Sequence, residues 1–169
     1  MKSAICVIAV MVAVQRRPLD DVRRELQAAY DRASAASIAA RTLTDFEAIH
    51  EWLDTPDCRF KEFGQPFRTW SEMRRYAELG LHTPIISFAS TIQTIEMRGD
   101  AAVATTLVRG VARIIDQEGR FGRKGAAHDV ETTATVRDTW VKSDHWRRKE
   151  HEKIAANAVT KVDGKPVHP

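Results

Sequence analysis

The sequence predicts one α+β domain in which helices cover one face of a curved antiparallel sheet. Before Pro84, apolar residues recur at every third or fourth position, which is typical of amphipathic helices. After Pro84, long runs rich in β-branched residues alternate in polarity, which is typical of strands. Helices followed by a meander of strands indicate the α+β class. The length of 169 residues is enough for a single hydrophobic core.

Residues 1–17 differ in composition from the rest of the chain. Lys2 precedes the apolar run Ala4–Val14, which is too short to span a bilayer but matches the hydrophobic region of a signal peptide. We therefore expect a signal peptide or disordered leader over 1–17 and one domain over 19–163. The protein is expected to be exported, periplasmic or secreted, if the leader is a signal peptide, and cytoplasmic otherwise. Cys58 is then the only cysteine, so neither an intrachain disulfide nor a Cys–His metal site is expected.

Three helices are predicted before Pro84, over residues 20–41, 44–53 and 69–80. The first presents one stripe of apolar residues, namely Val22, Leu26, Ala29, Ala33, Ala36 and Ala40. The other two begin at capping-box patterns, Thr44–Glu47 and Thr69–Glu72. A short strand, Cys58–Phe63, is expected between them.

The predicted sheet contains the short strand Cys58–Phe63 and four long strands. The long strands are Ile85–Met97, Ala101–Asp116, a strand through Asp138 and Trp146–Val162. Gly99-Asp100 between the first two long runs predicts a hairpin turn. A glycine-rich basic loop, Glu118–Ala126, leads into the strand through Asp138, and a solvated loop is its expected role.

Asp138 is the most informative polar residue because strict alternation places it on the inward face of its strand. That face carries Thr132, Ala134, Val136, Asp138 and Trp140, whereas mostly polar residues occupy the other. A carboxylate on an inward face must be paired, hydrogen-bonded or protonated, because burying a lone charge is costly. A structural ion pair with Arg109 or Arg113 is the alternative to a functional role.

The order of elements resembles the nuclear transport factor 2-like superfamily, which includes the SnoaL-like domains and ketosteroid isomerase. The resemblance covers about 19–162, and its local motifs are the strand around Asp57–Gly64 and the hairpin Arg137–Trp146. It implies a cone: a curved antiparallel sheet wraps around the long first helix, with two shorter helices, and leaves an apolar pocket. It also implies a homodimer through the sheet face that carries Thr133, Thr135 and Thr139.

Within this resemblance, Val136–Trp140 is similar to the ketosteroid isomerase strand whose protonated aspartate donates a hydrogen bond to an oxyanion. The position of the isomerase's base falls on Lys61, a cation, while the adjacent Glu62 points to the opposite side of the strand. The position of its tyrosine falls near Ser37. A steroid isomerase is therefore not expected.

The candidate catalytic residues are Asp138, with Glu62 or His151. His151 is expected to face away from Trp146, and no partner is evident for His50, His82 or His128. The candidate ligand-binding residues are aromatic, although core packing is their alternative role: Tyr30, Trp52, Trp70, Tyr76 and Trp140.

These features favour a domain that holds a small apolar molecule in a conical pocket, without a complete catalytic set. The alternative is a cofactor-independent SnoaL-type isomerase, dehydratase or hydrolase that uses Asp138, and the second alternative is a dimeric interaction domain. No metal site, cofactor or membrane span is expected. The net charge of +3, without a basic tract interleaved with aromatic residues, argues against nucleic-acid binding.

Overall fold

The structure, a computed structural model, describes residues 4–62, 65–74 and 83–167. Its elements are α1 (Ala4–Ala39), α2 (Leu43–Leu53), β1 (Asp54–Glu62), β2 (Arg68–Thr69), β3 (Ile85–Arg98), β4 (Ala101–Ile115), β5 (Ala127–Lys142), β6 (Trp146–Val162) and β7 (Lys165–Val167). This order confirms the predicted α+β class and the predicted run of helices before strands. The short strand β7 is an addition to the expected set.

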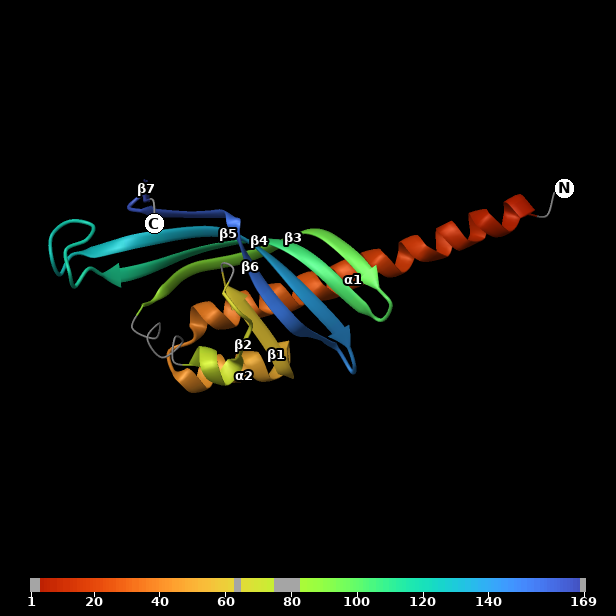
Figure 1. Cartoon of the computed structure of the whole chain (residues 1–169), viewed down its shortest axis with the longest axis horizontal. Coiled ribbons are helices and arrows are strands. Elements are labelled where there is room, and N and C mark those ends of the chain that lie inside the picture. Colours follow the sequence, from red (N-terminus) through yellow and green to blue (C-terminus); the bar gives the residue numbers. More distant parts are fainter. Residues whose placement is uncertain (1–3, 63–64, 75–82, 168–169) are drawn as a thin grey trace.

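The strands form one curved sheet in the order β2-β1-β6-β5-β4-β3, with β7 also paired to β6. β3 to β6 are antiparallel neighbours, as predicted, but β1 runs parallel to β6. The sheet is therefore mixed rather than antiparallel. The long stretch of chain between β1 and β6 allows the parallel pairing, which a tight hairpin could not connect. The sheet curves over α1 and α2, as Figure 1 shows.

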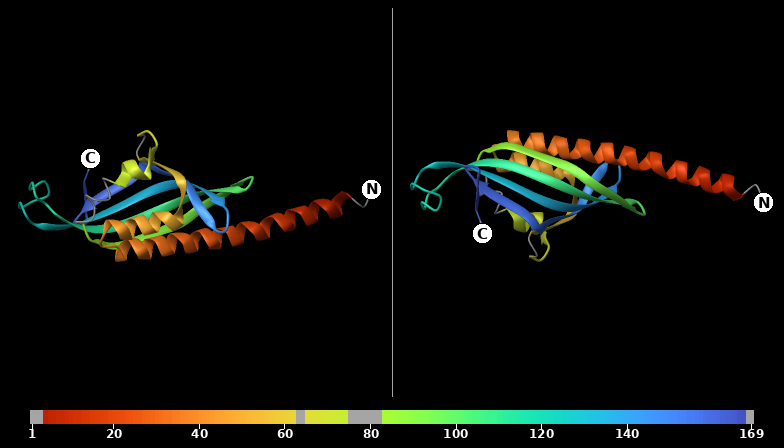
Figure 2. Two further views of the ribbon diagram at one scale, coloured as in Figure 1. Left: turned by 90° about the horizontal axis from the view of Figure 1, so that it is seen from below. Right: turned by 90° about the horizontal axis from the view of Figure 1, so that it is seen from above.

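Helix α1 packs along the concave side of the sheet through the predicted apolar stripe. Leu26, Tyr30 and Ala33 lie on this stripe and are buried. The helix is longer than predicted at its start: the backbone is helical from Ala4 rather than from Asp20, and its first part extends beyond the sheet (Figures 1 and 2). Residues 4–17 thus continue the helix, and removal of the leader with export stays a prediction. In the described part of the chain, no helix combines the length and apolarity needed to cross a membrane.

The N-cap of α2 lies two residues before the predicted one. Its N-cap is Thr42, whose hydroxyl accepts from the Asp45 N–H at 3.2 Å while the Asp45 carboxylate accepts from the Thr42 N–H at 2.8 Å. The predicted box at Thr44–Glu47 is therefore wrong. The third helix begins at Trp70, where the Glu72 carboxylate accepts from the Thr69 N–H at 2.7 Å as predicted; its later part lies outside the described residues.

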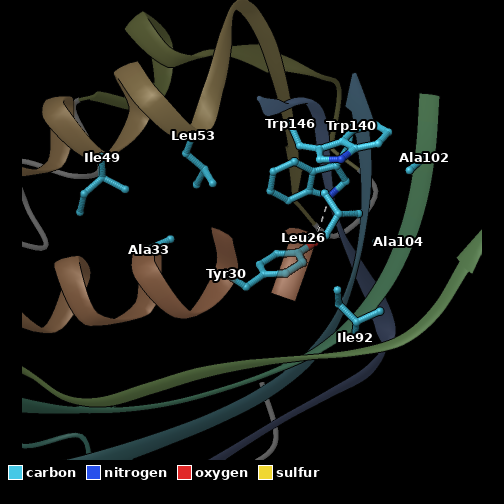
Figure 3. Packing of buried hydrophobic residues seen from close by; sticks show 10 residues of the cluster. All are labelled: Leu26, Tyr30, Ala33, Ile49, Leu53, Ile92, Ala102, Ala104, Trp140 and Trp146. Carbon is cyan, nitrogen blue, oxygen red and sulfur yellow. Dashed lines mark hydrogen bonds between the residues drawn. The ribbon is translucent and has the colours of Figure 1, made fainter. Parts of the chain in front are cut away.

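The hydrophobic core lies between α1, α2 and the strands of the sheet (Figure 3). Its buried members are Leu26, Tyr30, Ala33, Ile49, Leu53, Ile92, Ala102, Ala104, Trp140 and Trp146. The small side chains on β4 leave room for the two indoles. The predicted hairpin between β3 and β4 is confirmed, with Gly99 at φ 61°, a backbone conformation that favours glycine.

Candidate active site

Asp138 lies on the inner face of β5 between Val136 and Trp140, and its side chain is fully buried. This confirms the orientation that the alternation predicted. Its carboxylate contacts two side chains that are distant in sequence. The Tyr30 hydroxyl donates to Asp138 Oδ2, and His151 Nδ1 lies 2.6 Å from Oδ1. Asp138 is thus part of a buried polar cluster rather than an isolated charge.

The expectation that Asp138 would pair with Arg109 or Arg113 is wrong. In the register of β4 and β5, Asp138 lies opposite Ala104, several residues from either arginine. Arg113 instead donates to the two carboxylate oxygens of Asp129 at 2.7 and 3.0 Å. The cation nearest to Asp138 comes from β6.

Tyr30 on α1 is the tyrosine that contacts Asp138. Counting along the sequence had placed the position of the isomerase's tyrosine near Ser37. Its hydroxyl donates to Asp138 and accepts from Trp140 Nε1 at 3.3 Å, and the Tyr30 and Trp140 rings meet edge to face at 5.2 Å. Burial, followed by the negative charge of Asp138, raises the pKa of Tyr30 well above its ordinary value. Tyr30 is therefore a neutral hydrogen-bond donor at physiological pH.

His151 reaches the inner face because β6 contains one extra residue, Lys149. The pairs on either side of this bulge are Trp140–Arg148 and Thr139–Glu150. A bulge shifts the alternation by one position, so His151 lines the same interior as Trp146. The expectation that His151 faces away from Trp146 is wrong for this reason.

Arg148 connects the Asp138 cluster to a second carboxylate. Arg148 Nε and Nη2 donate to Asp54 at 2.7 and 3.2 Å, a bidentate pair. Asp54 also forms a hydrogen bond with Nδ1 of His50, so the expectation that His50 lacks a partner is wrong. On its other side, Arg148 Nη1 lies 3.1 Å from His151 Nδ1. Two histidine–aspartate pairs, His50–Asp54 and His151–Asp138, therefore flank one buried guanidinium.

The tautomer of His151 follows from its two neighbours. Its Nδ1 cannot both donate to Asp138 and accept from Arg148, and the carboxylate is the closer of the two, at 2.6 Å against 3.1 Å. Nδ1 therefore donates to Asp138, and Arg148 acts on His151 through its charge. In the neutral imidazole this leaves the lone pair on Nε2.

Asp138 is ionised at neutral pH. Burial by itself would raise the pKa of Asp138, but the charges of His151 and Arg148 and the hydrogen bonds from His151 and Tyr30 hold it below its ordinary value. Asp138 therefore differs from the protonated aspartate of ketosteroid isomerase, whose strand it resembles. Conversely, Asp54 and Asp138 raise the pKa of Arg148 despite its burial.

The two histidines face a cavity of about 420 Å³ between α1, α2 and the sheet. Its wall is mainly apolar and includes Phe46, Ile49, Leu53, Phe88, Val108 and Val136. Four of its polar side chains, His50, Asp138, Arg148 and His151, meet in one place. A mostly apolar pocket of this size with a few convergent polar groups is typical of a small-molecule site.

The other predicted catalytic residue, Glu62, lies apart from Asp138. Its carboxylate accepts from Lys153 Nζ, and it lines a small pocket of about 30 Å³ at another place on the sheet. Lys61, at the position of the isomerase's base, pairs with Glu152 at 3.0 Å. The structure therefore brings His151, but not Glu62, to Asp138.

The predicted ligand-binding aromatics divide among different places. Tyr30 lines the cavity, and Trp140 is fully buried behind it. Trp70 stacks on the His50 ring, with the two centroids 3.5 Å apart, and lines an adjacent cavity. Trp52 packs under the Arg32 guanidinium, 4.1 Å from its ring centroid. Tyr76 and His82 lie outside the described residues.

The sequence did not identify Asp54 or Arg148 as site residues, and it did not identify Asp54 as the partner of His50. One signal was available: His50 and Asp54 are four residues apart at the end of a predicted helix, which places them on one face. Nothing local identified Arg148, because it lies in a run of charged residues at the start of β6. Within the described residues, no cluster of three or more histidine, cysteine or acidic side chains is arranged to hold a metal ion.

The contacts of the buried Asp54 with Arg148 and His50 predict that the free energy of unfolding depends on pH. Burial by itself would raise the pKa of Asp54, but Arg148 and His50 outweigh this effect and lower the pKa from 3.8 to about 2. Because the folded-state pKa lies below the unfolded-state value, the stabilisation is complete above about pH 4 and is lost as the pH falls towards 2. We expect a loss of about 2 kcal/mol in the free energy of unfolding from this group. Urea denaturation at several pH values measures it; Asp54→Asn should lack this component, and an equal acid loss in that variant would contradict the prediction.

Comparisons with known proteins support the fold. Neither a protein-family model nor a curated protein matches the sequence. Solved structures do match: a nuclear transport factor 2-like superfamily protein from Salmonella enterica is 19% identical, with a TM-score of 0.56 over 82% of this chain and 95% of that chain. A scytalone dehydratase-like protein from Novosphingobium aromaticivorans is 14% identical, with a TM-score of 0.55 over 93% of each chain. A protein from Kribbella flavida is 16% identical, with a TM-score of 0.57 over 82% and 94%.

The chain therefore has the nuclear transport factor 2-like fold, as its sequence suggested. Proteins with this fold include ligand-binding and isomerase- or dehydratase-type domains. At these identities the similarity concerns the fold alone, so the function must be inferred from the site.

Proposed function

We propose that this protein is an acid–base enzyme of the isomerase or dehydratase type, which removes a proton from a carbon next to the carbonyl group of a small apolar molecule. The observation that carries this proposal is the buried Asp138–His151 pair, 2.6 Å apart, which faces an apolar cavity. It replaces our expectation of a binding domain without a complete catalytic set, because the bulge at Lys149 supplies the base that Asp138 lacked.

In this proposal His151 is the general base. Asp138 accepts from Nδ1 and so holds the lone pair on Nε2, the nitrogen that remains to meet a substrate. The hydrogen bond from His151, the charge of Arg148 and the hydrogen bond from Tyr30 hold the pKa of Asp138 below its ordinary value, and the two hydrogen bonds fix its orientation. Asp138 then stabilises the imidazolium that forms when His151 takes up the proton, as a buried carboxylate does in other histidine–aspartate pairs.

The cavity indicates the substrate class. Its volume of about 420 Å³ suits a molecule of one or two rings, and aliphatic and phenyl side chains form most of its wall. Hydroxyl groups of Ser37, Thr132 and Thr160 also line it and can hold a few polar groups of a ligand. The dehydratase name of one structure with this fold supports the same class of chemistry.

The test is exchange of the α-protons of benzylacetone, a small aryl ketone, in deuterated water. We expect the wild type to accelerate this exchange and Asp138→Asn to lose about a hundredfold, since the amide can donate to Nδ1 and so move the proton of His151 to Nε2. NMR of the ketone measures both rates. Exchange by Asp138→Asn at the wild-type rate would contradict the proposal.

A binding domain without chemistry remains the second candidate, because the Tyr30 hydroxyl is already engaged. It donates to Asp138 and accepts from Trp140, so its proton is not directed at a substrate oxygen. Under this alternative the wild type gives no exchange above buffer, and Asp138→Asn keeps the affinity for benzylacetone within about tenfold, or 1.4 kcal/mol.

A further inference from the structure

The pair His50–Asp54 repeats the geometry of His151–Asp138 on the other side of Arg148. In each pair the histidine Nδ1 meets a carboxylate, and the side chains of Asp54 and Asp138 are 5% and 0% exposed. Each histidine keeps a partly open ring, 20% exposed for His50 and 16% for His151, and both line the 420 Å³ cavity. The proposed function uses only one of these two pairs.

The tautomer of His50 follows from the same reasoning as that of His151. Asp54 is ionised, with a pKa of about 2, so Nδ1 of His50 donates to it. His50 Nε2 has no hydrogen-bond partner among the described residues. It therefore carries a lone pair when the imidazole is neutral and a transferable proton when it is charged.

The two rings are held apart at fixed positions. Phe60 packs against both rings, with its ring centroid 5.6 Å from that of His50 and 6.1 Å from that of His151. Trp70 packs against His50 and restrains it further. Arg148 separates the two histidine–aspartate pairs, and both histidines line the same cavity. Two imidazoles at separate points of one cavity wall are the arrangement required for removing a proton at one atom of a ligand and delivering one at another.

Apart from its histidines, the buried cluster carries a net negative charge. Asp54 and Asp138 are anionic, Arg148 is cationic and all three side chains are buried, so their charges sum to −1. Lys153, which also lines the cavity, forms an ion pair with Glu62, so its charge is balanced outside this cluster.

We propose that His50 is a second catalytic residue, a general acid that protonates the leaving hydroxyl of a β-hydroxy carbonyl substrate while His151 removes the α-proton. The C–H electron pair forms the new C=C bond, the C–O bond breaks with its electron pair, and the proton from His50 completes a molecule of water. His151 ends protonated and His50 neutral, so the net charge of the cluster is unchanged, and proton exchange with water restores the starting state. This inference rests on the proposed function of His151.

Two matched ketones test it. The β-hydroxy derivative of benzylacetone reports elimination through the ultraviolet absorbance of the conjugated enone, and benzylacetone itself reports α-proton removal alone. We expect His50→Gln to slow elimination about a hundredfold more than it slows exchange. His145→Gln, at a histidine that contacts the Trp52 carbonyl at 2.9 Å away from this cavity, should change neither rate.

The outcomes separate this inference from the proposed function. Elimination by His50→Gln at the wild-type rate, an equal loss of both rates, or a wild type that exchanges without eliminating would each overturn the role of His50. Exchange that survives in His151→Gln would instead overturn the proposed function. NMR of ¹⁵N-labelled histidine in the wild type needs no variant: a neutral His50 with its proton on Nε2 rather than Nδ1 would overturn the assignment.

Discussion

Arg148→Met is expected to lower the free energy of unfolding by about 3–5 kcal/mol, the typical cost of removing one partner from a buried charge cluster. The guanidinium is buried and makes two hydrogen bonds to Asp54, and its charge also holds the pKa of Asp138 below its ordinary value. Methionine keeps much of the side-chain volume but leaves two buried carboxylates without their shared cation. Urea denaturation followed by tryptophan fluorescence at neutral pH measures the loss.

Arg147→Met is the matched control for this change. Arg147 is adjacent in β6 but only partly buried, and its hydrogen bond to the Glu51 carbonyl is 3.3 Å long. We therefore expect a loss of less than about 1 kcal/mol. Asp54→Asn added to Arg148→Met should recover part of the stability, because it removes one of the unpaired charges. A loss of less than 1 kcal/mol in Arg148→Met would show that the cluster does not depend on its cation.

His151→Gln is expected to reduce the α-proton exchange of benzylacetone about a thousandfold, within the range attributed to a general base. The effect should exceed that of Asp138→Asn, because glutamine removes the base itself whereas asparagine disturbs only its tautomer. Glutamine can still donate a hydrogen bond to Asp138, so the fold should persist. Exchange rates from NMR, with far-ultraviolet circular dichroism as the check on folding, measure the outcome.

Two results would contradict this prediction. A His151→Gln variant that exchanges within tenfold of wild type would exclude His151 as the base. A similar loss in His145→Gln would show that the assay responds to general damage, because His145 lies away from the cavity that contains Asp138.

The sequence by itself determined the features that depend on near neighbours. Period-two alternation placed Asp138 inward, the apolar stripe on α1 placed Leu26 and Ala33 in the core, and Gly99 marked the hairpin. These features are local because side-chain direction within a helix or strand is fixed by the geometry of that element. The same local information gave the fold class and the position of the cavity-facing carboxylate.

Only the tertiary structure decided which groups meet Asp138. Tyr30 is 108 residues away from Asp138 in sequence, and its contact with Asp138 depends on the position of α1 along the sheet. His151 faces inward only because of one extra residue in β6, a register shift that appears when two strands are paired and not in either strand alone. The Asp54–Arg148 pair, 94 residues apart, exists because β1 lies parallel to β6, a pairing that no local pattern specifies.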